Sequence, residues 1–284
     1  MTRIALFGHK GYLGGQLAYY LLQKGICVDG YDMPESDITS ATFWDVFQPS
    51  QYAAIFFFSG VTGTEVGFER AAEYVAVNEI GLLNLLVKIS TLGISAPKVV
   101  FPSTRLVYEG SERLLAEESA KDAKTVYAVN KLACENFLKA YHNRFGIPYA
   151  VVRICVPYGN LISCDYSYGT IGFFLKQAAA GRIILYGGGV QRRTFTHVSD
   201  ICEAVFRLAG SEKNGVYNIG GENLTLCEVA KMIASLKRAE VAAVPWPESA
   251  LKLESGSTCF CASKLDAAVG KLEYKRFSSL VKEL

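Results

Sequence analysis

Residues 3–14 read RIALFGHKGYLG, an apolar run followed by three glycines spaced three apart. The run predicts a buried strand over 3–7, and the apolar spacing after it predicts a helix over 12–24. A glycine-rich turn between a strand and a helix lets the backbone bend sharply and approach a ligand, while free amides at the helix N-terminus attract an anion. This stretch therefore predicts the start of a parallel α/β sheet with a phosphate-binding turn.

The same alternation of strand and helix continues through the first half of the chain. Short runs of aliphatic and aromatic residues predict buried strands, and apolar residues at three- and four-residue steps predict helices between them. Repeated units of this kind form a doubly wound α/β domain around a buried parallel sheet. The predicted strands are 26–31, 53–58, 97–102 and 149–155, and the predicted helices are 40–48, 68–91 and 125–145.

The second half of the chain has a different pattern. From about residue 156 the alternation weakens, and turns such as Tyr186-Gly187-Gly188-Gly189 interrupt it. We therefore expect the doubly wound domain at 1–156 and a smaller mixed α/β lobe, which binds substrate, at 157–284. Because no Pro/Ser-rich linker separates them, the two parts are expected to pack together, with about 170–182 and 198–219 lying back on the first domain.

Composition and charge argue against several classes of function. The 284 residues include 29 Lys and Arg against 27 Asp and Glu, a net charge of +2, whereas nucleic-acid binding needs clustered positive charge. No run of about 18 uncharged apolar residues occurs, so no membrane span is expected. The first residues do not resemble a signal peptide, which favours a cytoplasmic protein. The eight cysteines include no Cys-x-x-Cys pair, so we expect no metal site and mostly buried thiols.

An acidic residue ends the second predicted strand. Asp32 lies 18 residues after Gly14 (32 − 14), where a carboxylate can accept hydrogen bonds from an adenosine ribose and repels the 2′-phosphate of NADP. With the glycine turn, this predicts NAD as the cofactor. In the alternative, the glycines form only a tight turn, and Asp32 only caps a separate turn with Pro34. Asp37 and Ile38 could flank the adenine ring, unless Asp37 simply caps the helix expected near residue 40.

Three side chains are candidates for acid/base chemistry. Tyr127 and Lys131 stand four residues apart on a predicted helix, so both lie on one face. The ordinary tyrosine pKa is about 10, and a nearby ammonium stabilises the phenolate, which suits a general acid/base. Thr104, with Ser103, follows a buried strand, and the carboxyl ends of parallel strands form the ligand crevice. The alternatives are a solvated helix face for the Tyr-Lys pair and a turn residue for Thr104.

In this order, the motifs resemble those of the extended short-chain dehydrogenase/reductase family, specifically its nucleotide-sugar epimerases, dehydratases and 4-ketoreductases. The resemblance runs through nearly the whole chain and implies a Rossmann-type fold. It rests on the glycine turn, Asp32, Asp37-Ile38, Phe58-Ser59-Gly60, Asn78, Ser103 to Tyr108, Tyr127 to Lys131, Arg153, Tyr158-Gly159, Gly187 to Asp200, Tyr217 to Gly221 and Ser263-Lys264.

The resemblance implies a role for each matching residue. Tyr127 is expected to be the acid/base, Lys131 to bind ribose and lower the tyrosine pKa, and Thr104 to orient the substrate. Arg193 is expected to bind the diphosphate of a nucleotide-diphosphate sugar, unless it is an ordinary surface arginine. The residues expected to bind NAD are Gly8, Gly11, Tyr12, Leu13, Gly14, Asp32, Asp37, Ile38, Phe58, Ser59, Gly60, Asn78, Tyr127 and Lys131.

Departures from the family pattern narrow the choice of reaction. Dehydratases of the family carry an acidic pair after the threonine, where this chain has Arg105 and Leu106. Leucine cannot transfer a proton, so dehydration is not expected. Val156 replaces an asparagine that contacts substrate in many members, so the pocket is not a standard one.

The leading interpretation is an NAD-dependent nucleotide-sugar 4-epimerase. A 4-ketoreductase that uses exogenous NAD(P)H once per product needs the same three side chains and remains the alternative. A non-catalytic protein that binds NAD(H) as a sensor or interaction module is a third possibility. The resemblance also implies a homodimer that pairs helices 68–91 and 125–145, whose apolar residues alone would indicate only core, and it suggests polysaccharide biosynthesis as the pathway.

Overall fold

A computed structural model of the chain describes residues 3–92, 95–162 and 169–283. Its centre is a six-stranded sheet in the order β2-β1-β3-β4-β5-β9, in which every neighbouring pair is parallel. From β1 the chain first turns to β2 on one side and then crosses to β3 on the other, which is the switch point where such sheets bind ligands. The strands are β1 Arg3–Phe7, β2 Cys27–Tyr31, β3 Ala54–Phe57, β4 Lys98–Thr104, β5 Tyr149–Ile154 and β9 Gly215–Asn218.

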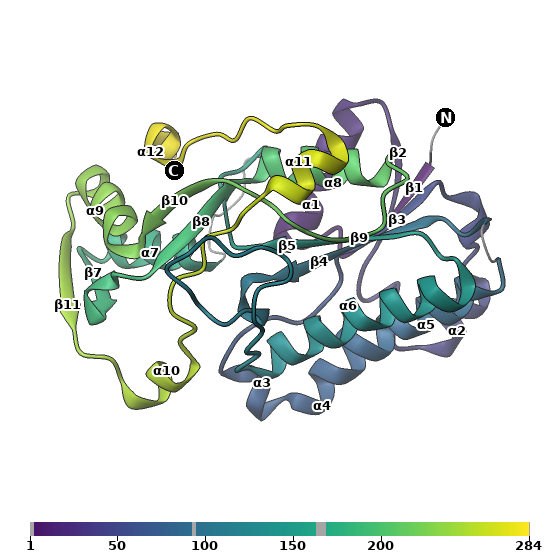
Figure 1. Ribbon diagram of the computed structural model, residues 1–284, viewed down its shortest axis with the longest axis horizontal. Coiled ribbons are helices and arrows are strands. Elements are labelled where there is room, and N and C mark those ends of the chain that lie inside the picture. The colour runs from purple at the N-terminus through teal and green to yellow at the C-terminus, as the bar shows by residue number, and fades with distance from the viewer. Residues whose placement is uncertain (1–2, 93–94, 163–168, 284) are drawn as a thin grey trace.

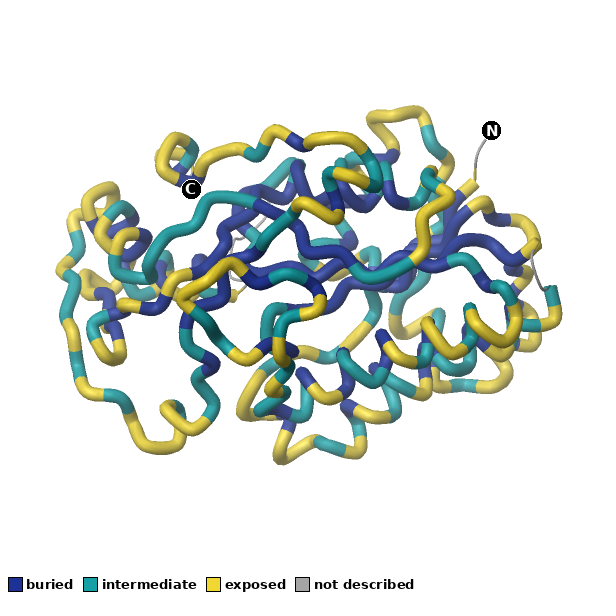
Figure 2. The backbone as a smooth tube through the Cα atoms, in the orientation of Figure 1, coloured by how far each residue is buried: buried dark blue, intermediate teal, exposed yellow. Residues whose placement is uncertain are grey.

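Helices cover both faces of this sheet (Figure 1). On one face α1 Tyr12–Gln23, α8 Val198–Ala209 and α11 Ser263–Val269 pack over an aliphatic core. On the other, α2 Ala41–Val46, α5 Gly81–Ser90 and α6 Val126–Phe145 pack over an aromatic-rich core that includes Phe7, Trp44 and Phe57. Figure 2 shows the strands as the buried middle layer between these helices. The expected Rossmann-type α/β fold is therefore confirmed.

The helix predicted over 68–91 is interrupted. The chain forms α3 Val66–Glu69, α4 Ala71–Tyr74, a π-helical segment at Val75–Ile80 and then α5. Asn78 in the π-helical segment binds the backbone of Val61, with its Oδ1 accepting from the Val61 N–H at 2.9 Å and its Nδ2 donating to the Val61 carbonyl at 3.1 Å. π-helical turns often mark functional sites, and this one holds the loop that follows β3.

The second lobe has its own sheets and its own core. A three-stranded sheet contains β6 Val156–Tyr158, β8 Arg192–His197 and β10 Glu222–Thr225, and β7 Arg182–Tyr186 pairs with β11 Glu240–Val244. Helices α7 Gly169–Ala179 and α9 Leu226–Lys237 cover them. The remaining short elements are α10 Glu248–Leu253, α12 Phe277–Leu280 and the 3-10 turns Pro49–Gln51, Arg105–Val107, Gly187–Gly189 and Val281–Glu283.

Two segments of the second half behave differently from one another. α8 and β9, within 198–219, return to the first sheet and to the core beneath α1. α7, within 170–182, directs Ile171, Phe174 and Ala178 into the core of the second lobe.

The structure also shows how far the cysteines are buried and whether any helix could cross a membrane. Cys134, Cys155, Cys202 and Cys259 are buried, Cys227 and Cys261 are half-buried and Cys27 is exposed, whereas Cys164 lies outside the described residues. Among the residues that the structure describes, no helix combines the length and the apolar character needed to cross a membrane.

Candidate active site

The glycine turn brings β1, β3 and the start of α1 into close contact. Gly8 has φ +81°, and a Cβ there would lie 2.6 Å from the backbone of Phe58 and Ser59. A Cβ on Gly14 would lie 2.0 Å from the Gly8 carbonyl oxygen, so both positions require glycine. No side chain caps the N-terminus of α1, and its first turn holds no acidic residue. The amides there form the kind of cradle that binds a pyrophosphate.

Asp32 lies against this turn. Its carboxylate accepts hydrogen bonds from the backbone N–H groups of Lys10 and Met33, each at 2.9 Å. The Lys10 ammonium reaches the Met33 carbonyl at 2.8 Å and Glu35 at 3.1 Å, which ties the two loops together. A carboxylate has about four acceptor positions, so Asp32 keeps acceptor capacity for ribose hydroxyls. The residues present therefore fit the adenosine half of NAD.

Asp37 and Ile38 lie further along this loop. Asp37 accepts from the N–H and hydroxyl of Thr39, at 2.9 and 2.7 Å, so its side chain forms a local turn and does not cap α2. Ile38 is buried in the aromatic-rich core, and its carbonyl accepts from the Trp44 indole. Neither side chain lines the main cavity described next.

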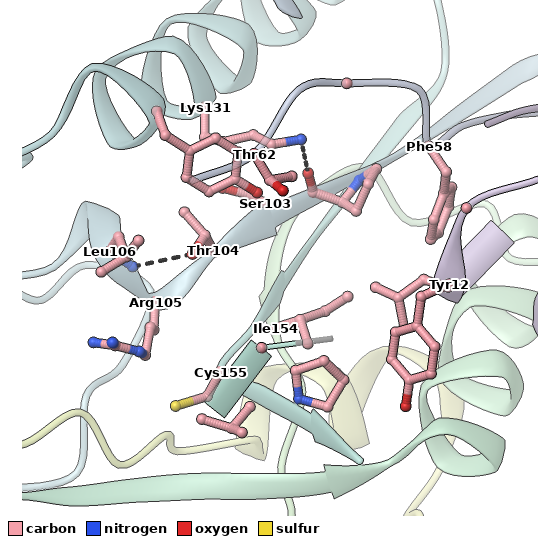
Figure 3. Close-up of a pocket in the computed structure, with 18 of the residues that line it drawn as sticks. Tyr12, Phe58, Thr62, Ser103, Thr104, Arg105, Leu106, Lys131, Ile154 and Cys155 are labelled. Atoms are coloured by element: carbon pink, nitrogen blue, oxygen red, sulfur yellow. Dashed lines mark hydrogen bonds between the residues drawn. The ribbon is translucent and has the colours of Figure 1, made fainter. Parts of the chain in front are cut away.

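A cavity of about 700 Å³ extends from the glycine turn to the carboxyl ends of β4 and β5. Figure 3 shows Tyr12 and Phe58 at one end and Arg105 and Cys155 toward the other. The predicted residues that line it are Gly8, Gly11, Tyr12, Leu13, Gly14, Phe58, Gly60, Thr104, Tyr127 and Lys131. The predicted residues that do not are Asp32, Asp37, Ile38, Ser59, Asn78 and Arg193.

Lys131 and Tyr127 meet in this cavity as the helical spacing predicts. The Lys131 ammonium donates to the Pro102 carbonyl at 2.8 Å and lies 4.3 Å from the centre of the Phe101 ring and 5.6 Å from that of Tyr127. Burial lowers the pKa of Lys131 from 10.5 to about 8. A cation beside the tyrosine ring favours the phenolate form electrostatically, so the pair can move a proton at the tyrosine hydroxyl.

Thr104 and Ser103 end β4 side by side but have different partners. Thr104 Oγ1 accepts from the Leu106 N–H at 3.3 Å, a weak contact that leaves the hydroxyl proton available to the cavity (Figure 3). Ser103 donates to Glu135 on α6 at 2.5 Å. Glu135 in turn forms a buried ion pair with Arg153 on β5, in which both side chains are 4% exposed. This network fixes the end of β4 relative to α6, which also carries Tyr127 and Lys131.

Arg193 does not reach the cavity. Its side chain, in a residue only 1% exposed, forms an ion pair with Glu254 at 2.6 Å and donates to the Arg192 and Gly256 carbonyls. A role in binding a diphosphate therefore requires Glu254 to release it.

Arg105 is the charged residue of the cavity that the motif analysis did not assign to the site. It was recognised only as a departure from the family pattern at the position after Thr104. It lines the cavity, and its Nη1 nitrogen is buried without a hydrogen-bond partner among the described residues. The feature of the sequence that could have identified Arg105 as a site residue is its place, as a basic residue, directly after a buried strand.

A second cavity of about 360 Å³ adjoins the first at Gly169 and Thr170. Its wall includes Tyr186 and Trp246, whose ring centres are 5.4 Å apart. The Gln191 side-chain oxygen in this wall is buried and has no hydrogen-bond partner within the described part of the chain. Flat aromatic walls with one unpaired acceptor suit a planar ligand that carries an N–H donor. The sequence pattern predicts a turn at Tyr186 to Gly189 and a family motif at Gly187 to Asp200, but no cavity between them.

Comparison with known proteins identifies the family of the chain. Residues 4–220 match the model of the NAD dependent epimerase/dehydratase family. The chain is 28% identical over 211 residues to the dTDP-D-glucose 4,6-dehydratase of Mus musculus, an alignment that spans 72% of this chain and 58% of that protein. It is 26% identical over 242 residues to the UDP-glucuronate 4-epimerase of Thermodesulfobacterium geofontis, covering 75% and 73%.

Solved structures agree with the fold. The UDP-glucose 4-epimerase of Thermotoga maritima superimposes with a TM-score of 0.87 at 19% identity, covering 99% of this chain and 96% of that one. At this identity the likeness shows the fold. The family match confirms the expected membership and the NAD dependence that its description states.

Proposed function

Since the chain belongs to the NAD dependent epimerase/dehydratase family, we propose that it is a nucleotide-sugar epimerase that works through a transient 4-keto sugar. The observation that carries the proposal is one continuous cavity. It joins the glycine turn, where a pyrophosphate fits, to Thr104, Tyr127 and Lys131 at the carboxyl end of the sheet.

The proposed mechanism assigns one task to each side chain. Bound NAD supplies reversible hydride transfer at the sugar carbon. Tyr127, as a phenolate, takes the proton of the sugar hydroxyl during oxidation and returns it after the sugar has turned over. Lys131 stabilises that phenolate through its charge, and Thr104 donates a hydrogen bond that orients the reacting oxygen.

The remaining parts of the site would bind rather than react. The amides at the start of α1 hold the NAD pyrophosphate, and Asp32 accepts from the adenosine ribose. The nucleobase of the substrate would enter the second cavity and lie against the Tyr186–Trp246 pair, and the Gln191 oxygen, which has no partner among the described residues, would accept from a base N–H.

Two alternatives follow from the same residues. A 4-ketoreductase would use Tyr127 to donate a proton once per product, with reduced dinucleotide supplied from solution. A non-catalytic NAD(H) sensor is disfavoured because Thr104, Tyr127 and Lys131 are all present and line one cavity. Dehydration is disfavoured because the two residues after Thr104 are Arg105 and Leu106.

A homodimer formed through α5 and α6 is part of the proposal, as are a cytoplasmic location and a place in polysaccharide biosynthesis. The two helices lie side by side on the outside of the molecule (Figure 1). They expose large apolar side chains, including Val87 at 58% and Val129 at 51%. Exposed apolar residues grouped on one face are typical of an interaction surface.

The first experiment is native mass spectrometry of the purified, undialysed protein, followed by identification of every small molecule released on denaturation. NAD at one per subunit in a dimer supports an epimerase that regenerates its cofactor. Protein that arrives without dinucleotide and binds added NADH weakly supports the reductase.

The matched variants are Tyr127→Phe and, on the same helix, Tyr141→Phe. We expect Tyr127→Phe to bind NAD normally and to lose epimerisation of UDP- and dTDP-linked sugars, while Tyr141→Phe keeps both. Unchanged turnover in Tyr127→Phe would refute the assignment.

A further inference from the structure

Arg105 stands out among the charged side chains that the structure describes because it lines the main cavity while one of its guanidinium nitrogens has no hydrogen-bond partner there. It follows Thr104 at the end of β4 and lines the main cavity. Its Nη1 nitrogen is buried and makes no hydrogen bond within the described residues. Arg105 as a whole is half-buried, but a guanidinium nitrogen that is shielded from water and makes no hydrogen bond is costly in free energy.

The surroundings of Arg105 do not balance its charge. A second cation, Arg193, acts on Arg105, and the carboxylate of Glu254 is already engaged with Arg193 in an ion pair at 2.6 Å. Burial, and then the charge of Arg193, lowers the pKa of the Arg105 guanidinium. Cys155 lies nearby but burial raises the pKa of its thiol, so it stays neutral. Two arginines and one carboxylate leave one positive charge in excess at the cavity wall.

The position of Arg105 indicates which part of a ligand it faces. It lies toward the end of the cavity opposite the glycine turn, as Figure 3 shows, and is therefore remote from the NAD pyrophosphate. It is the residue next to Thr104, which in the proposed function orients the reacting sugar oxygen. A group that meets Arg105 is thus attached to the sugar ring or lies very close to it.

We propose that Arg105 determines substrate specificity by binding a carboxylate carried by the sugar, so that the substrate is an acidic nucleotide sugar. A guanidinium fork matches a carboxylate with two parallel hydrogen bonds. Such a ligand supplies the missing negative charge beside the buried Nη1 nitrogen. The inference rests on the proposed function, because it places a sugar in this cavity.

The test compares three ligands that share one nucleotide. UDP, UDP-glucose and UDP-glucuronate, and the same three with thymidine, are titrated calorimetrically into NAD-loaded protein. All proteins carry Tyr127→Phe so that no turnover occurs. We expect the uronate to bind roughly 30-fold or more tightly than the glucose compound, the range for an interaction of a buried charge pair.

Arg105→Gln removes the charge, and Arg144→Gln, at the exposed far end of α6, is the matched control. We expect Arg105→Gln to reduce uronate binding to the level of the glucose compound and to leave UDP and UDP-glucose unchanged. Arg105→Lys keeps the charge but loses the fork, and an intermediate uronate affinity is expected. Arg105→Lys is the variant used for the test if Arg105→Gln does not fold.

The other outcomes overturn the proposal in distinguishable ways. Equal losses for all three ligands in Arg105→Gln would assign the arginine to the diphosphate. Unchanged binding of all three would show that Arg105 meets no anion, while the proposed function would stand. Protein that binds NAD but none of the nucleotides would overturn the inference together with the proposed function.

Discussion

Replacement of Lys131 by methionine distinguishes the effect of the buried lysine on the stability of the fold from its role in the active site. Lys131 is 5% exposed, and burial lowers its pKa from 10.5 to about 8. Each tenfold change in proton affinity is worth about 1.4 kcal/mol, so burying the charged form costs about 3 kcal/mol at neutral pH. Methionine gives up the hydrogen bond to the Pro102 carbonyl, worth about 1 kcal/mol. We therefore expect Lys131→Met to raise the free energy of unfolding by about 2 kcal/mol in cofactor-free protein, and to abolish turnover.

The pH dependence of this difference identifies its cause. Below pH 8 the lysine is charged in both folded and unfolded chains, so the stability advantage of the variant is complete. Between about pH 8 and 10.5 only the unfolded chain keeps the proton. The wild type therefore gains stability relative to the variant as pH rises, and the advantage disappears.

The assay is urea unfolding of both proteins, without NAD, from about pH 7 to about pH 10, followed by circular dichroism. Lys139→Met, at an exposed position of the same helix, is the control and is expected to change little at any pH. A Lys131→Met variant that is less stable than wild type at neutral pH, or a difference that does not vary with pH, would refute the reasoning.

Two further substitutions test the turn and the ion pair. Gly14→Ala places a Cβ 2.0 Å from the Gly8 carbonyl oxygen and is expected to abolish NAD binding measured by calorimetry, whereas Gly15→Ala, whose Cβ lies 3.4 Å from the nearest atom, should preserve it; equal affinities would contradict the role of the turn. Glu135→Ala leaves the buried Arg153 with its hydrogen bonds to Tyr108 and the Glu117 carbonyl but without an ion-pair partner, and is expected to cost about 3–5 kcal/mol in thermal or urea unfolding. Glu73→Ala in an exposed pair is expected to cost less than about 1 kcal/mol. A similar small effect at both sites would show that the buried network does not fix β4.

The first half of the fold could be predicted because its signals are local. Buried parallel strands are continuous apolar runs, and the predicted 149–155 and 125–145 differ from β5 Tyr149–Ile154 and α6 Val126–Phe145 by one residue at an end. The break in the helix predicted over 68–91 could not be predicted in this way. It depends on a contact between Asn78 and Val61, which are distant in the chain, and no periodicity records such a contact.

In the candidate site, too, local relations could be predicted from the sequence and contacts between distant segments could not. Tyr127 and Lys131 could be placed together from the sequence because a separation of four residues on a helix puts both on one face. Thr104 could be placed because the end of a parallel strand lies at the ligand crevice. The chemical environment of these side chains could not be predicted from the sequence. The burial that lowers the pKa of Lys131 involves Phe101 and Pro102 on β4 as well as its own helix.

The two arginines show why a motif can identify a residue and still misplace its task. Arg193 belongs to a recognisable motif, yet its partner Glu254 lies 61 positions away in the chain and holds it inside the second lobe. Arg105 belongs to no motif that favours binding, yet it lines the cavity, and its buried Nη1 nitrogen has no partner within the described residues while Glu254 pairs with Arg193. The Arg193–Glu254 pair thus sets the excess charge that a substrate must meet. Glu254→Gln would leave the positive charges of both arginines without a carboxylate partner. We therefore expect that variant to bind anions more tightly than the wild type.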